Sequence, residues 1–217
     1  FLSNGCSIGS DDGSNGNGND YVAWAWDAGS STVTNTDGDI SSQVRALPSA
    51  GFSVITYTGS AGSLSNPKTI GHGLGVKPTW IIMKNLTDGE NWIVWIATNR
   101  TVGHSNVNTG GDKYFALNSS DRMFNNQDSL FASQDATSSV WTLGGENVVN
   151  GTGKNYVAYA FTDVAGYSNT GVYVGNGNDD GSFVQTDFKP YFIIIKCSTQ
   201  GEHWQVPIYP EEDNGEL

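Results

Sequence analysis

One stretch of this chain occurs twice, and that duplication restricts the folds open to it. Residues 77–84 have the sequence KPTWIIMK, and residues 189–196 repeat it as KPYFIIIK. In both copies a polar turn with a glycine follows the apolar run, and a second short run then begins at Trp92 or Trp204. Runs that are rich in isoleucine and aromatic residues and bounded by turn residues predict a buried strand with its hairpin partner. The duplication therefore predicts a chain built from repeated β-rich units.

A second duplication involves a strand with alternating large and small side chains. Residues 21–26 (YVAWAW) are repeated by residues 156–161 (YVAYAF), and a turn rich in glycine and asparagine precedes each copy. Both copies are therefore expected to be strands. Residues 27–50, which follow the first copy, are mostly polar and have no counterpart after the second. We expect them to form a surface loop inserted into the first unit.

The composition agrees with an all-β fold. The 217 residues include 28 glycines and only 15% charged residues, a mixture that favours many short strands joined by turns. Repeats of this length are too long for the rungs of a solenoid and are typical of a β-sandwich. We therefore predict jelly-roll-like β-sandwich repeats, with one complete unit over residues 1–150 and a partial second unit over residues 151–217.

Four strings of residues, taken together, resemble the repeats of one class of proteins. They are YVAWAWDAG at 21–29, VITYTG at 54–59, GHGLGVKP at 71–78 and GYS at 166–168. These strings are similar to repeats in tail-fibre-like structural proteins of marine and freshwater bacteriophages and related aquatic metagenomes. The resemblance implies a β-sandwich repeat in an extended fibre, located outside the cell or on the virion surface. It supplies no catalytic or metal-binding residues.

Charge and motif content argue against several classes of function. A net charge of -12 disfavours binding to a nucleic-acid backbone. No stretch approaches the roughly 20 apolar residues of a membrane span. No nucleophile motif or metal-type spacing accompanies the three histidines, His72, His104 and His203. We therefore expect no enzyme, and a carbohydrate-active enzyme is the least favoured of the functions considered.

Calcium is the one cofactor that the sequence suggests. Residues 176–181 (NGNDDG) echo the oxygen spacing of a calcium loop, although the same composition is typical of ordinary turns. The candidate ligands are Asn176, Asn178, Asp180 and Asp187.

Cysteine and asparagine residues supply two kinds of candidate modification site. Cys6 and Cys197 either form a disulfide in an oxidising compartment or remain free thiols. Four asparagines lie in the N-glycosylation pattern: Asn85, Asn99, Asn118 and Asn150. Chance accounts for such matches in a chain this rich in asparagine, serine and threonine, and Asn99 and Asn118 fall in the more polar surroundings.

The seven tryptophans suggest a glycan-binding platform as an alternative function. However, Trp92 and Trp204 occupy the same place in two copies of a strand, which favours packing in the core. Trp24 and Trp26 face the same way along their strand and are likewise expected to be core residues. A receptor- or glycan-binding module of a fibre, with cell-surface glycans as partners, is thus the second function considered.

The positions in the repeat at which the chain is expected to open and stop favour a structural role. Residues 1–5 resemble residues 141–145, so the chain is expected to open at the end of one unit and to stop midway through another. Sheets interrupted in this way have unpaired edges, which recruit another chain unless they are covered. We therefore expect the subunit of an extracellular fibre, in which copies of the chain join head to tail by strand exchange. The expected donor residues are Phe1, Leu2 and Ile8.

Overall fold

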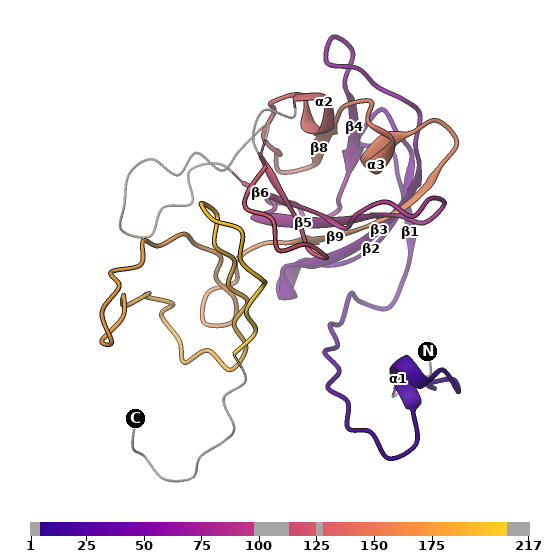
Figure 1. Ribbon diagram of the computed structural model, residues 1–217. Coiled ribbons are helices and arrows are strands. Elements are labelled where there is room, and N and C mark those ends of the chain that lie inside the picture. Colours follow the sequence, from indigo (N-terminus) through magenta and orange to yellow (C-terminus); the bar gives the residue numbers. More distant parts are fainter. Residues whose placement is uncertain (1–4, 98–112, 125–127, 208–217) are drawn as a thin grey trace.

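The computed structural model describes residues 5–97, 113–124 and 128–207, and within them the regular structure is nearly all β. Nine strands form two antiparallel sheets, and the helices are single turns (Figure 1). The fold is therefore all-β and sandwich-like, as the sequence predicts. None of the helices in these residues has the length and apolar character needed to cross a membrane.

Seven strands form the large sheet, and its order differs from the order in the sequence. Across the sheet the strands are β1 (Val33–Asn35), β2 (Ser42–Leu47), β3 (Phe52–Thr58), β9 (Asn155–Phe161), β5 (Trp80–Asn85), β6 (Ile93–Ile96) and β7 (Tyr114–Ala116). The last strand of the unit, β9, thus lies in the middle of the sheet, antiparallel to β3 on one side and β5 on the other.

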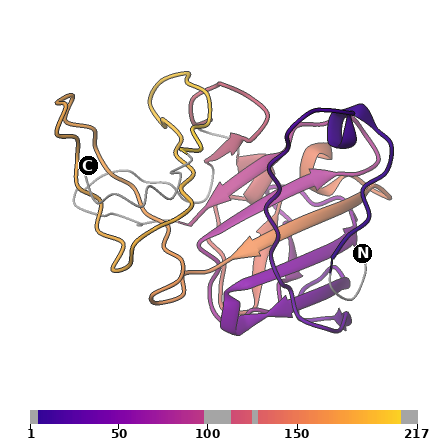
Figure 2. The ribbon, with the colours of Figure 1, turned by 90° about the horizontal axis from the view of Figure 1, so that it is seen from below.

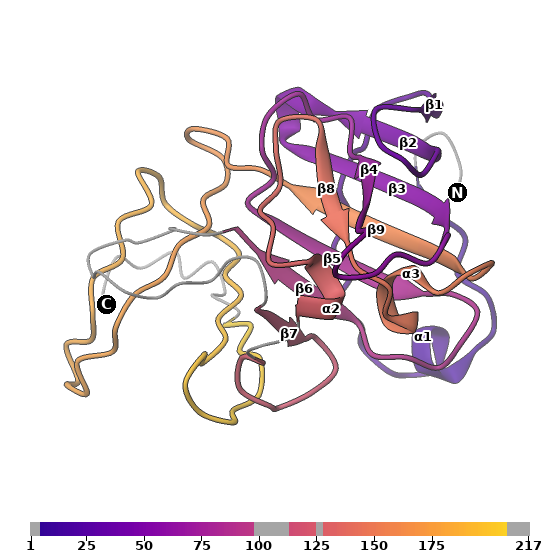
Figure 3. The ribbon, with the colours of Figure 1, turned by 90° about the horizontal axis from the view of Figure 1, so that it is seen from above.

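A smaller layer covers one face of this sheet. It contains the two-stranded sheet of β4 (Lys68–Gly71) and β8 (Val140–Leu143), together with α2 (Asp128–Phe131) and α3 (Asn147–Asn150). Figure 3 shows these elements lying above the large sheet. Residues 5–26, which include α1 (Asp12–Asn15), cross the opposite face (Figure 2).

Alternation of side chains along the strands explains the core. In β5 the side chains of Ile81, Met83 and Asn85 are buried, while the residues between them are half-buried. In β9 the same face carries Ala158 and Ala160, both fully buried. Small side chains on the central strand leave room for the large residues of the covering layer to approach the sheet.

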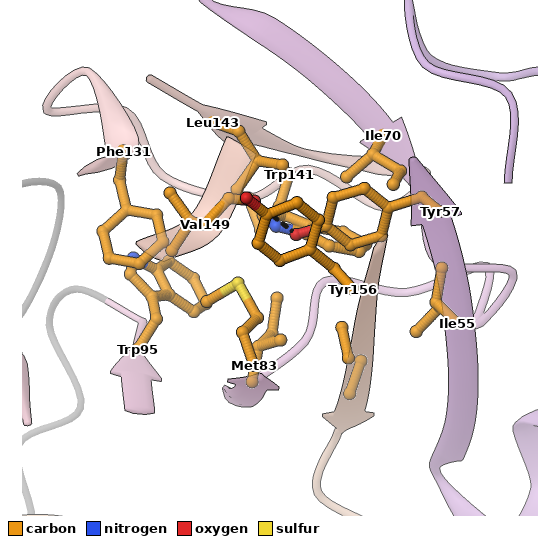
Figure 4. Close-up of a cluster of buried hydrophobic side chains, with 14 of the residues drawn as sticks. Ile55, Tyr57, Ile70, Met83, Trp95, Phe131, Trp141, Leu143, Val149 and Tyr156 are labelled. Atoms are coloured by element: carbon orange, nitrogen blue, oxygen red, sulfur yellow. Dashed lines mark hydrogen bonds between the residues drawn. The ribbon is translucent and has the colours of Figure 1, made fainter. Parts of the chain in front are cut away.

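Two stacked tyrosines join the sheet to the covering layer (Figure 4). The rings of Tyr57 in β3 and Tyr156 in β9 lie 5.0 Å apart between centroids, with an interplanar angle of 15°. The Tyr57 hydroxyl donates a hydrogen bond to the Val149 carbonyl at 2.7 Å. Burial raises the pKa of Tyr57, so its hydroxyl remains a donor. Aromatic packing and a satisfied polar group therefore meet at one place in the core.

The structure corrects the prediction that residues 27–50 are a surface loop. They contain β1 and β2, and β2 pairs along its whole length with β3. The polar composition arises because exposed Gln43 and Arg45 alternate with buried Ser42 and Val44. Such alternation is typical of a strand with one solvated face. The segment is thus part of the sheet.

The predicted domain boundary between residues 150 and 151 is also wrong. β9 lies beyond that boundary, yet it pairs with β3 and β5 in the middle of the first unit's sheet. A sequence repeat shows that two segments are equivalent, but it does not show at which strand the folded unit begins. The complete unit runs from β1 to β9, and residues 162–207 contain no strand.

Candidate assembly interface

Residues 8–26, here called the N-terminal module, match residues 143–161 of the folded unit without a gap. The match aligns Tyr21 with Tyr156, and it aligns Ile8 with Leu143 at the end of β8. The structure contains a single helical turn at the same place in each copy, α1 in the module and α3 in the unit. The module is therefore a second copy of the segment that contains β9.

The two copies share one arrangement of hydrogen bonds around a tyrosine. In the unit, the Tyr156 hydroxyl donates to the Asn147 carbonyl at 2.6 Å and accepts from the Gly151 N–H at 2.7 Å. In the module, the Tyr21 hydroxyl donates to the carbonyl of Asp12 at 2.7 Å and accepts from the N–H of Gly16 at 2.8 Å. These are the matching positions of the alignment. The tyrosine thus closes the same loop in both copies.

An asparagine and a glycine complete the shared arrangement. The Asn150 side chain donates to the Gly144 carbonyl at 2.8 Å, and Asn15 donates to the carbonyl of Gly9 at 2.7 Å. Gly18 and Gly153, which also match, have φ angles of 78° and 71°, a conformation that favours glycine. The module therefore adopts its fold without the neighbouring strands that surround β9.

Burial is where the two copies differ. Tyr156 is fully buried, whereas Tyr21 is 46% exposed. Trp24 and Trp26 are 51% and 45% exposed, so the prediction that they are core residues is wrong. Their counterparts Tyr159 and Phe161 are themselves only half-buried, because they point to the face of the sheet away from the core. Residues 21–26, which were expected to be a strand, form no strand or bridge.

The C-terminal segment, residues 166–207, contains a copy of the β5–β6 hairpin. The bridge between Ile195 and Gln205 repeats the pair formed by Met83 and Ile93. The Lys196 ammonium donates to the Glu202 carbonyl, as the Lys84 ammonium donates to the carbonyl of Glu90. The register of the hairpin is therefore the same in both copies.

A counterpart of β3 precedes that hairpin. Residues 171–175 (GVYVG) match residues 55–59 (ITYTG), which places Tyr173 at the position of Tyr57. Tyr173 is exposed, in contrast to Tyr57. The C-terminal segment thus contains copies of β3 and β5, the two strands that flank β9 in the sheet.

Aromatic rings of the module contact the C-terminal segment of the same chain. Ring centroids of Trp24 and Phe192 lie 5.3 Å apart, and those of Trp26 and Phe192 lie 6.3 Å apart. Trp26 also packs on the outer face of the sheet, 6.3 Å from Phe52 and 6.1 Å from Phe161. These contacts hold the module against its own sheet.

Two of the four glycosylation candidates are structural residues. Asn85 is buried, donates to the Asn147 carbonyl at 3.0 Å and accepts from the Thr87 N–H at 2.8 Å. Asn150 is fully buried and accepts from the N–H of Ser60 at 3.0 Å. Glycans cannot be attached to either side chain in the folded unit. Asn118 is exposed and remains a candidate, and Asn99 lies outside the described residues.

The calcium candidates lie in exposed turns. Asn176 accepts from the Asn178 N–H at 3.0 Å and donates to the Gly181 carbonyl, so its side chain stabilises its own turn. Asp187 accepts from the Gln185 side chain at 2.6 Å. Across the part of the chain that the structure describes, no group of three or more His, Cys, Asp and Glu side chains could hold a metal ion.

Cys6, Cys197 and Ile8 lie within the residues that the structure describes. Cys6 and Cys197 are both free thiols, so the disulfide alternative does not form within the chain. Hydrogen bonding to Thr199 lowers the pKa of the Cys197 thiol. Ile8 is exposed, while Phe1 and Leu2 lie outside the described residues.

The repeated tryptophans of the hairpins lie at the edge of the core. Trp92 and Trp204 are half-buried, whereas Trp95 and Trp141 occupy the core itself. The indole N–H of Trp204 donates to the Ala116 carbonyl at 3.0 Å, which docks the C-terminal segment beside β7. Equivalence in the repeat thus predicts a shared place, but it does not predict the depth of burial.

Comparison with known proteins adds a family but no function. No curated protein and no solved structure matches the chain. The match to a family covers residues 1–210, and so includes the N-terminal module, the complete unit and the C-terminal segment. The chain belongs to the family described as a domain of unknown function, DUF7483.

Proposed function

We propose that this chain is a structural subunit of an extracellular or virion-surface fibre, which assembles with copies of itself by β-strand exchange. One observation carries the proposal: the N-terminal module repeats the turn and the tyrosine hydrogen bonds that precede the buried central strand β9, yet its residues 21–26 are exposed and form no strand or bridge. Strand addition supplies main-chain hydrogen bonds along an edge and places alternate side chains in pockets.

The energetic argument favours covering the module. Aromatic side chains bury about 150–250 Å² each. At about 25 cal/mol per Å², covering the exposed half of Tyr21, whose counterpart Tyr156 is fully buried, contributes roughly 2–3 kcal/mol. This contribution is a sizeable fraction of the whole stability of a typical domain, about 5–15 kcal/mol. Burial of Tyr21 therefore favours association of copies.

Charged substitutions on the module test this function. Ala23 and Ala25 are exposed in the single chain, but their counterparts Ala158 and Ala160 are fully buried in the sheet. The double substitution Ala23→Asp and Ala25→Asp should leave the unit folded and abolish association, because exchange would bury both carboxylates. Sedimentation velocity over a concentration series is the measurement.

The control introduces a single aspartate outside the module. Ser31→Asp changes an exposed residue beyond the module and should associate as the native chain does. A native chain that stays monomeric throughout the concentration series would exclude strand exchange. Association that survives both aspartates would show that another surface carries it.

A surface hollow supports the second candidate, a glycan-binding module. Its volume is about 300 Å³, and it is lined by Leu117, Asn118, Ser119, Ser120, His203 and Trp204. An indole beside amide, hydroxyl and imidazole groups is suited to a sugar ring. Glycan-array binding that is lost with His203→Ala and kept with Ser31→Asp would support this function, and the absence of any binding would count against it.

A further inference from the structure

The strand order of the large sheet shows where an added strand of the module's type would belong. β9 lies between β3 and β5 and is antiparallel to both. The N-terminal module contains a copy of β9, and the C-terminal segment contains copies of the two flanking strands. The two parts of the chain are thus complementary: one supplies the central strand, and the other supplies its neighbours.

We propose that residues 21–26 of one copy form the strand between residues 171–174 and residues 192–197 of a second copy. The inference rests on the proposed function and adds to it the acceptor segment and the register. It moves the donor strand from Phe1, Leu2 and Ile8 to the residues that repeat β9.

The pairing of β5 with β9 sets the register on one side. Within the unit, Asn85 lies opposite Tyr156, and Trp80 lies opposite Phe161. Transferred to the copies, Tyr21 of one chain lies opposite Cys197 of the next. The same transfer places Trp26 opposite Phe192, a pair that corresponds to the stacked rings of Phe161 and Trp80 at 4.2 Å.

The pairing of β3 with β9 sets the register on the other side. Tyr57 lies opposite Tyr156, so Tyr173 of the acceptor lies opposite Tyr21 of the donor. The same alternation turns Ala23 and Ala25 towards the core side. There Ala25 lies opposite Ile193, as Ala160 lies opposite Ile81 in the unit. Ala23 lies opposite Ile195, as Ala158 lies opposite Met83. The large acceptor residues therefore face small donor residues.

A second copy fits this place better than the chain's own segment. Within one chain the module lies across the outer face of the sheet, where Trp26 packs on Phe52 and Phe161. Ala28, two residues later, is already buried in the unit. Trp24 and Trp26 of the module contact Phe192 of the chain's own C-terminal segment, but residues 21–26 form no bridge. Pairing with another molecule leaves that short connection in place.

The native Cys197 provides a direct test of the register. Residues directly opposite one another in antiparallel strands have Cα atoms about 4.5–5.5 Å apart. That separation lies within the roughly 4.4–6.8 Å range of disulfides. In a chain that also carries Cys6→Ser, oxidation of Tyr21→Cys should yield covalent dimers and longer ladders on non-reducing electrophoresis. The matched variant Val22→Cys should not, because its side chain points to the opposite face of the strand.

A second pair guards against damage to the module's loop, which the Tyr21 hydroxyl closes. Ala23→Cys with Ile195→Cys, in a chain with Cys6→Ser and Cys197→Ser, should also give chain-to-chain disulfides. The control replaces Ile194 instead of Ile195, which turns the acceptor thiol to the other face.

The outcomes separate the register from the function. Association seen by sedimentation without either crosslink would overturn the register and leave the proposed function standing. Crosslinking that is as strong in the control variants, with Val22→Cys or Ile194→Cys, as in the test variants would also overturn the register. A disulfide within one chain would overturn the second copy as the partner. A monomeric chain without crosslinks would overturn both proposals.

Discussion

At the scale of single residues, the two matched tyrosines allow the effect of burial to be measured. Tyr156→Phe removes a buried hydroxyl that donates to the Asn147 carbonyl and accepts from the Gly151 N–H. We expect it to lower the free energy of unfolding by about 1–3 kcal/mol, because both partners lose a buried hydrogen bond. Tyr21→Phe removes the same bonds in the exposed module and should change the unfolding of the unit by less than about 0.5 kcal/mol. Urea denaturation of both variants is the measurement, and equal effects would contradict the prediction.

The buried side chain of His72 should make the stability of the unit depend on pH. It is fully buried; its Nδ1 accepts from the Leu74 N–H at 3.2 Å, and its Nε2 lies 3.3 Å from the Thr137 carbonyl oxygen. Burial lowers its pKa below the ordinary value of 6.5. The unfolded chain therefore binds the proton first, so the stabilisation is complete above pH 6.5 and is lost as the pH falls towards the folded pKa.

The measurement is the unfolding free energy as a function of pH. His72→Gln should remove the decrease that begins below pH 6.5, whereas His203→Gln, at an exposed residue, should keep it. The pKa values of Asp39 and Asp88 are lowered from the ordinary value of 3.8. These two carboxylates therefore affect stability only at lower pH than His72 does, and they do not obscure the decrease that begins below pH 6.5. An unchanged pH profile in His72→Gln would assign the decrease to other groups.

At the scale of elements, β2 is the strand whose role the sequence conceals. Val44 is buried against the core, and Gln43, its neighbour, faces solvent. Val44→Asp should unfold the unit or cost several kcal/mol, because it buries an unpaired charge. Gln43→Asp should change stability by less than about 0.5 kcal/mol. Thermal unfolding monitored by circular dichroism distinguishes the two. A folded, stable Val44→Asp chain would restore the loop interpretation of residues 27–50.

The strands that the sequence predicts best are those with long apolar runs and a second copy. β5 and β9 are examples, and the all-β class follows from them with the turn-rich composition. The position of β9 could not be predicted, because its neighbours in the sheet are far away in the sequence. Asn85 and Asn150 match a glycosylation pattern, but their side-chain amides form hydrogen bonds with buried backbone groups. That role could not be predicted from the three-residue pattern, because some of the partners are far away in the sequence.

The module's fold was visible in the sequence, but only weakly. Asn15, Gly16 and Gly18 match Asn150, Gly151 and Gly153 without a gap. A competing similarity between residues 1–5 and 141–145 suggested another alignment. The repeated hydrogen bonds of the structure decide between the two alignments, because they join matching positions only in the first.

At the scale of the whole molecule, charge opposes assembly. Each copy has a net charge of -12, so neighbouring copies repel one another. Salt shortens the Debye length from about 30 Å at 0.01 M to about 10 Å at 0.1 M. The fraction of chains in oligomers should therefore rise over this range, as measured by sedimentation equilibrium. A fall with salt would indicate an interface held by charge pairs rather than by strand pairing.

The loop closed by Tyr21 has a kinetic consequence. A disordered tail must lose conformational entropy when it joins a sheet, which slows or weakens its capture. The N-terminal module has its turn and its glycine conformation in place before it meets a partner, so much of that ordering precedes the encounter. Growth of the proposed fibre should then proceed without a lag phase, because less of the donor segment has to become ordered at each addition.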